Sequence, residues 1–140
     1  MSIGTPIKSK LDTRSDEYQE NLVAMQAMWS EVAEQLAMVP GVGGQRYVDR
    51  HRRRGKMLVR ERFEALVDPD TPLIELQPLA GWGTQDPVGV GIFNGIGVVE
   101  GVECAIQGSD MTYRGGSMNP TTFRKQVRLQ DIARENRLPI

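Results

Sequence analysis

The chain has 140 residues, of which 39% are hydrophobic and 25% charged, with a formal net charge of −1. This length allows one domain with a sizeable core, and the balanced charge gives no reason to expect a nucleic acid or a membrane as a partner. With Cys104 as the only cysteine and His51 as the only histidine, the sequence excludes an internal disulfide and a cysteine-rich zinc site and argues against Ser-His and Cys-His hydrolases. We expect a cytoplasmic protein without a bound metal.

Residues 1–14 are polar and without a period, which predicts a flexible N-terminal arm. From Ser15 to about Val39 the pattern is helical, with Ser15 as the cap and Pro40-Gly41 as the stop. The apolar residues of this helix recur at spacings of three and four and form one stripe: Tyr18, Leu22, Met25, Trp29, Val32 and Leu36. Such a stripe packs either on its own domain or on a partner subunit, and the sequence leaves both open.

A basic segment follows a flexible, glycine-rich joint at residues 41–44. Between residues 46 and 62 the basic side chains are Arg46, Arg50, Arg52, Arg53, Arg54, Lys56, Arg60 and Arg62, against Asp49 and Glu61. Charge runs are most often solvated faces, and the sharper alternative is a phosphorylated ligand or an acidic partner surface. A short helix then buries Val59, Phe63, Leu66 and Val67 before a turn at residues 68–72, so that residues 15–70 form an N-terminal helical segment.

The second half of the chain has strand-like runs rich in glycine. We expect a short strand at residues 73–76 and an antiparallel pair at residues 90–99 and 102–107, joined by a turn at Glu100-Gly101. Glycine alternating with apolar residues indicates a tightly layered sheet. A helix over residues 121–136 follows, with Asn119 as N-cap and Pro120 at its first position.

The corner between the last strand and this helix is Gly115-Gly116-Ser117. Such a corner leaves backbone N–H groups without side chains in the way, which suits a phosphate, a carboxylate or a thioester oxygen. The alternative is a tight turn that merely requires glycine, and from these residues alone the turn is the favoured interpretation.

Four motifs, in order, give the chain a specific resemblance. They are HRRRGKMLVRER at residues 51–62, GIFNGIG at 91–97 with VEGVEC at 99–104, DMTYRGGS at 110–117, and RLQDIARENRLP at 128–139. Together they resemble the N-terminal portion of the carboxyltransferase β subunit of biotin-dependent acyl-CoA carboxylases, of the methylcrotonyl-, geranyl- and propionyl-CoA type. The last motif is more similar to the methylcrotonyl and geranyl branch, and the single cysteine excludes the branch with a four-cysteine zinc ribbon.

The resemblance implies an α/β fold, the crotonase-like β-β-α superhelix, here incomplete and beginning at about residue 71. It implies transfer of a carboxyl group from carboxybiotin to an acyl-CoA, with backbone amides holding the enolates. The corner residues Arg114, Gly115, Gly116 and Ser117 are then expected beside the acyl-CoA, which reverses the preference for a simple turn. Arg53, Arg54 and Lys56 are candidates for the CoA phosphates or for a subunit contact, and no catalytic side chain is assigned.

The resemblance also implies partners. Biotin is expected on a biotin carboxylase/biotin carboxyl carrier α subunit, and the complete subunits are expected to form a homo-oligomer, a hexamer. The cytoplasm is the expected location, or the mitochondrial matrix in a eukaryote. Because the family's next oxyanion corner would follow Ile140, we expect a fragment, a truncated product or one piece of a split subunit, inactive alone. The alternative is a catalytically inactive relative that acts as an interaction or regulatory module.

Overall fold

The computed structural model describes residues 8–140, so the part of the expected N-terminal arm at residues 1–7 lies outside the described residues. By its internal contacts the described chain divides into two compact units, with the boundary between Ala33 and Glu34. In the described part of the chain no helix has the length and apolar character needed to cross a bilayer. The predicted domain boundaries at residues 14/15 and 70/71 stay a prediction.

The first long helix, α1 (Asp16–Met38), begins where the sequence predicts. The Ser15 hydroxyl accepts a hydrogen bond from the Tyr18 N–H at 3.2 Å, which is the expected cap. None of its residues is buried, and Met25 and Trp29 in the predicted stripe are each 61% exposed. A short 3₁₀ turn, η1 (Val39–Gly41), follows it.

The basic segment forms α2 (Gln45–Arg53), and the short helix α3 (Val59–Glu64) comes next. Val59 and Phe63 are buried as predicted, but Leu66 is 49% exposed because α3 ends before it. In the joint before α2, Gly43 is closely packed: a Cβ there would overlap the Thr112 carbonyl. That close approach is the physical reason for glycine there, in place of the expected flexible joint.

The sheet has three antiparallel strands in the order β1 (Ile74–Glu75), β2 (Ile92–Val99) and β3 (Val102–Ser109). The predicted strand start at Val90 is wrong, because Val90 and Gly91 have φ of 47° and 68° and form a turn before β2. The β2–β3 turn at Glu100-Gly101 is confirmed, and the Asp68 carboxylate accepts both N–H groups, at 2.8 and 2.7 Å.

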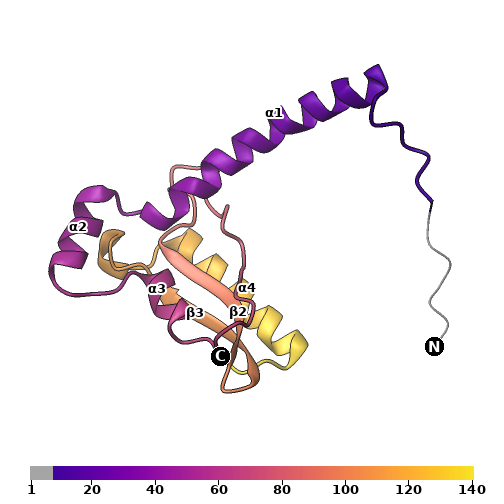
Figure 1. The fold of residues 1–140 in the computed structure, drawn as a ribbon. Helices are drawn as coiled ribbons and strands as arrows, with labels where there is room; N and C mark the ends of the chain where they lie inside the picture. Colours follow the sequence, from indigo (N-terminus) through magenta and orange to yellow (C-terminus); the bar gives the residue numbers. More distant parts are fainter. Residues whose placement is uncertain (1–7) are drawn as a thin grey trace, which may run out of the picture. The chain divides into compact units, whose positions relative to one another are not determined.

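The two faces of β3 carry two apolar clusters, because successive side chains point to opposite faces. On one face Val59 and Phe63 of α3 pack with Phe93 and Ile106, and the two phenylalanine rings stack at 4.7 Å. On the other face Ala105 packs with Leu129 and Ala133 of the last helix, α4 (Pro120–Asn136). Figure 1 shows β2 and β3 with α3 and α4 beside them.

The start of α4 is fixed by its predicted cap. The Asn119 side chain accepts the Thr122 N–H at 2.8 Å and donates to the Asp86 carboxylate at 2.8 Å. Phe123 is 55% exposed while Leu129 is fully buried, so only one side of α4 is covered by the described chain.

Candidate functional site

A cavity of about 740 Å³ separates the α2 region from the loop that leads to the Gly115-Gly116-Ser117 corner. Five basic or imidazole side chains line it: Arg50, His51, Arg54, Lys56 and Arg114. Tyr47, Tyr113 and Gly115 are among the other residues that line this basic cavity. Two segments far apart in the sequence, both singled out from the sequence, therefore share one cavity.

Helical spacing decides which residues of the basic run reach the basic cavity. Tyr47, Arg50 or His51, and Arg54 follow one another at steps of three and four, which is one face of a helix. Arg52 lies on another face, where its guanidinium bonds the Glu61 carboxylate at 2.6 Å. Arg53 is likewise absent from the cavity lining.

The lining of the basic cavity contains no carboxylate. Within residues 8–140 the ion pairs join Arg14 to Asp12, Arg52 to Glu61, Arg60 to Glu75 and Arg134 to Asp131. None of them uses a basic side chain of the cavity. Guanidinium and ammonium groups gathered without counter-charges produce a local positive field, and they bind phosphate or carboxylate by charge-assisted hydrogen bonds.

The corner itself is a left-handed turn, η2 (Arg114–Gly116), in which the three residues have φ of 49°, 65° and 80°. The Gly116 N–H donates to the Tyr113 carbonyl at 2.9 Å, and the Ser117 N–H donates to the Arg114 carbonyl at 3.2 Å. The expectation of bare amides is therefore wrong for these two residues, because the turn uses both N–H groups internally. Gly115 is the glycine of the corner that lines the basic cavity.

Of the residues predicted for the site, Arg54, Lys56, Arg114 and Gly115 line the basic cavity together. Arg53, Gly116 and Ser117 do not line it. The sequence interpretation missed Tyr47, Arg50, His51 and Tyr113, although the helical spacing of the basic run would have selected the first three. What the predicted residues bind stays a prediction.

A second cavity of about 390 Å³ adjoins the first, and His51, Lys56 and Met111 line both. The Met111 thioether lies under the corner, where a Cβ on Gly116 would come within 2.6 Å of its sulfur. Met111 is therefore the side chain shared by the two cavities and the corner.

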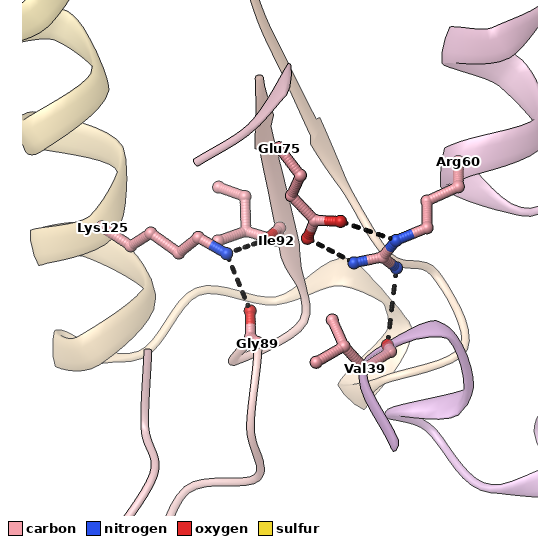
Figure 2. Close-up of polar contacts among 6 residues, drawn as sticks. All are labelled: Val39, Arg60, Glu75, Gly89, Ile92 and Lys125. Atoms are coloured by element: carbon pink, nitrogen blue, oxygen red, sulfur yellow. Dashed lines mark hydrogen bonds and ion pairs between the residues drawn. The ribbon is translucent and has the colours of Figure 1, made fainter. Parts of the chain in front are cut away.

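Figure 2 shows a partly buried ion pair between Arg60 and Glu75, together with the buried Lys125. Arg60 of α3 donates to both oxygens of Glu75, at 3.0 and 2.5 Å, and to the Val39 carbonyl at 3.4 Å. Lys125 of α4 is 3% exposed. Burial lowers the pKa of Lys125 to about 8, because desolvation outweighs the attraction of Glu75, and Arg60 lowers it further.

Comparison with known proteins gives the family. The model of the carboxyl transferase domain matches residues 50–140, which include the corner and all five basic or imidazole side chains of the basic cavity. This chain belongs to the carboxyl transferase family. The resemblance found in the sequence is thereby confirmed.

The relatives of this carboxyl transferase chain are longer than it is. A probable biotin-dependent acyl-CoA carboxylase β2 subunit of Mycobacterium tuberculosis is 46% identical over 96% of the chain, which covers 25% of that protein. The crystal structure of the Pseudomonas aeruginosa geranyl-CoA carboxylase β subunit has a TM-score of 0.69 at 33% identity, covering 95% of this chain and 25% of that one. For a transcarboxylase 12S structure, described as a hexamer with methylmalonyl-CoA bound, the TM-score is 0.68 at 27% identity, with 78% and 22% covered.

These structures confirm the predicted fold class, an incomplete crotonase-like α/β fold preceded by helices. The chain spans about a quarter of the length of the relatives that it matches.

Proposed function

We propose that this chain is the N-terminal part of an acyl-CoA carboxyltransferase subunit and forms part of its acyl-CoA site. The observation that carries the proposal is the basic cavity, whose lining brings Arg54 and Lys56 together with Arg114 and Gly115. CoA combines several phosphate charges with a long neutral arm that ends in a thioester. A cavity lined by several cationic side chains and by a glycine backbone fits both parts.

The residues have distinct roles in this proposal. Arg54 and Lys56, with Arg50 beside them, hold the CoA phosphates, and Arg114 adds a further cation next to Gly115. Gly115 approaches the thioester end, while Gly116 and Ser117 keep the corner in shape through their internal hydrogen bonds. Arg53, which points elsewhere, is assigned to a subunit contact.

The reaction proposed for the complete subunit is transfer of a carboxyl group from carboxybiotin to the acyl-CoA. Biotin supplies the carboxyl carrier chemistry, on a biotin carboxylase/biotin carboxyl carrier α subunit. The names of the relatives support these partners, one being biotin-dependent and another a hexamer with a CoA ester bound. We propose a homo-hexamer of complete subunits, located in the cytoplasm, or in the mitochondrial matrix in a eukaryote.

The test is calorimetric titration of the chain with CoA, dephospho-CoA and pantetheine. CoA should bind most tightly and pantetheine most weakly, because the cationic side chains attract phosphate groups and pantetheine has none. Arg54→Gln and Lys56→Gln should each weaken CoA binding about tenfold, which is roughly 1.4 kcal/mol.

Arg53→Gln is the matched control, since it removes the same charge from the neighbouring position outside the basic cavity. It should change the affinity less than twofold. Equal affinities for CoA and pantetheine, or equal losses in Arg53→Gln and Arg54→Gln, would refute the phosphate assignment.

A second function, that of an interaction module, is favoured by the exposed stripe of α1, where Met25 and Trp29 are each 61% exposed. If the stripe binds a partner subunit, Trp29→Glu should lower the self-association measured by sedimentation without changing CoA binding. Unchanged sedimentation would remove this candidate.

A further inference from the structure

The turn before β2 is left-handed over three successive residues. Gly89, Val90 and Gly91 have φ of 84°, 47° and 68°. Glycine accepts this region, but a β-branched residue there is a genuine outlier. Val90 is nonetheless fully buried, and its side chain occupies the space where a Cβ of Gly81 would lie, 2.7 Å from its Cγ1. The surrounding structure must therefore hold this turn in place.

Lys125 holds the turn from the side of α4. Its ammonium donates to the Ile92 carbonyl at 2.8 Å and to the Gly89 carbonyl at 3.4 Å, so it bridges the two ends of the turn (Figure 2). The backbone of α4 is fixed at the same residue, because the Asn94 amide donates to the Lys125 carbonyl at 2.8 Å. Only backbone carbonyls accept from this ammonium among the described residues.

The turn in its own right contacts the loop that forms the wall of the basic cavity. The Gly91 carbonyl accepts the Asp110 N–H at 2.9 Å, and the Tyr113 ring lies where a Cβ of Gly91 would be. The Asp110 carboxylate accepts the N–H and the hydroxyl of Thr112, at 2.8 and 2.6 Å. Thr112 and Tyr113 line the basic cavity next to Arg114 and Gly115.

We propose that Lys125 is a positioning residue for the acyl-CoA corner: its ammonium clamps the left-handed turn at Gly89–Gly91, and the turn fixes Tyr113 and thus the wall at Arg114 and Gly115. Each step is a contact described above. The ammonium donates to the carbonyls of the turn, the Gly91 carbonyl accepts from the Asp110 amide, and the Tyr113 ring packs against Gly91. The part concerning acyl-CoA rests on the function proposed above.

An uncharged side chain of similar length would fill the space of Lys125 at least as well. A buried ammonium is costly to desolvate, and in this site desolvation is the largest influence on the group, ahead of Glu75 on β1 and Arg60 on α3. The hydrogen bonds to the turn are what a methionine would lose. Lys125→Met therefore separates the clamp from mere packing.

The experiment compares the 140-residue chain with its Lys125→Met and Arg128→Met variants by NMR. Arg128 is an exposed residue of the same helix and serves as the matched control. In Lys125→Met the Asp110 amide should exchange with solvent at least tenfold faster, and the Tyr113 ring resonances should shift. The amides of the β2–β3 ladder around Ala105 should keep their protection. Arg128→Met should show none of these changes.

CoA binding to the same variants distinguishes the two proposals. Weaker CoA binding in Lys125→Met, by about fivefold or more, together with the Asp110 and Tyr113 changes, supports both. The same changes with unaltered CoA binding keep the clamp and refute the placement of acyl-CoA. An unchanged Asp110 amide and Tyr113 ring in a folded Lys125→Met chain overturn the clamp.

If Lys125→Met does not fold, the wild-type chain provides the second measurement. Loss of the ammonium charge should move the Tyr113 ring and Asp110 amide resonances between pH 7 and pH 9, with a midpoint near pH 8. The charged groups that face the ammonium are Glu75 on β1 and Arg60 on α3. Tyr113 and Asp110 resonances that stay unchanged while the Lys125 ammonium itself titrates would overturn the proposal.

Discussion

Gly115 and Gly116 are neighbours with the same handedness of backbone and different surroundings. Both have positive φ, 65° and 80°, but a Cβ on Gly115 would meet nothing within 4 Å, whereas one on Gly116 would press on the Met111 sulfur. A substitution at Gly115 therefore tests backbone strain alone, whereas one at Gly116 tests backbone strain together with a steric contact.

Gly115→Ala and Gly116→Ala should each lower the free energy of unfolding by about 1 kcal/mol through the backbone alone. The free energy of unfolding should fall further in Gly116→Ala than in Gly115→Ala, because only the Gly116 methyl group has to displace the Met111 thioether. Only Gly115→Ala adds a methyl group to the wall of the basic cavity and should weaken CoA binding directly. Chemical denaturation measures the change in stability, and calorimetry measures the change in CoA affinity. If both changes were equal in the two variants, Gly115 and Gly116 would not differ in their surroundings as described.

The pKa of Lys125 predicts how stability depends on pH. Its pKa is about 8 in the folded chain and 10.5 as its ordinary value, so between these values the unfolded chain binds more protons. The free energy of unfolding should therefore receive a contribution from Lys125 that rises from pH 8 to pH 10.5. Denaturation at several pH values measures it. The rise should be smaller in Lys125→Met, and parallel curves for the two chains would contradict the prediction.

At the scale of the element, α4 depends on its first turn. Asn119 caps the helix through the Thr122 N–H and also ties it to Asp86. Asn119→Ala should lower the free energy of unfolding by about 1–2 kcal/mol, because both hydrogen bonds are lost. Asn119→Ser keeps a capping oxygen but lacks the hydrogen bond to Asp86, so its free energy of unfolding should fall less than that of Asn119→Ala. Thermal denaturation ranks the variants, and equal losses would show that the cap contributes little.

Elements with local signals were predictable from the sequence. The cap at Ser15, the cap at Asn119 and the turn at Glu100-Gly101 all depend on residues close in sequence, and the structure has each of them. The start of β2 was predicted two residues early, since Val90 has every preference of a strand residue. What overrides that preference is the ammonium of Lys125, which lies 35 positions along the chain and was invisible to local reasoning.

The candidate site was partly predictable for the same reason. Arg54 and Arg114 were both singled out, but nothing in the sequence placed them in one cavity. They are far apart along the chain, and only the folded structure brings them together. The family resemblance supplied the interpretation of the corner. It did not indicate that the Gly116 and Ser117 amides are used within the turn.

On the scale of the whole molecule, the net charge of −1 conceals a separation of charge. The helix α1 has five acidic side chains, Asp16, Glu17, Glu20, Glu31 and Glu34, and no lysine or arginine. Residues 45–56 have six arginines and lysines against Asp49. Local charge, and not net charge, is what a ligand in the basic cavity meets.

CoA binding should therefore weaken as salt rises, although the chain as a whole is close to neutral. Raising ionic strength from about 0.05 to 0.5 M shortens the screening length several-fold, and the affinity should drop by about an order of magnitude. Arg54→Gln should reduce the slope of affinity against salt, while Arg53→Gln leaves it unchanged. A binding constant independent of salt would refute an electrostatic site.

Met111 gives the basic cavity a chemical vulnerability. Its side chain is 52% exposed, it lines both cavities, and its sulfur touches the space above Gly116. Peroxide converts such a thioether into a sulfoxide, which replaces a flexible apolar side chain in the cavity wall with a polar one. Mild oxidation should thus weaken CoA binding, and methionine sulfoxide reductase should restore it, while Met111→Leu stays insensitive to both treatments. The affinity of an acyl-CoA site with this residue in its wall would therefore fall under oxidising conditions before the fold itself is damaged.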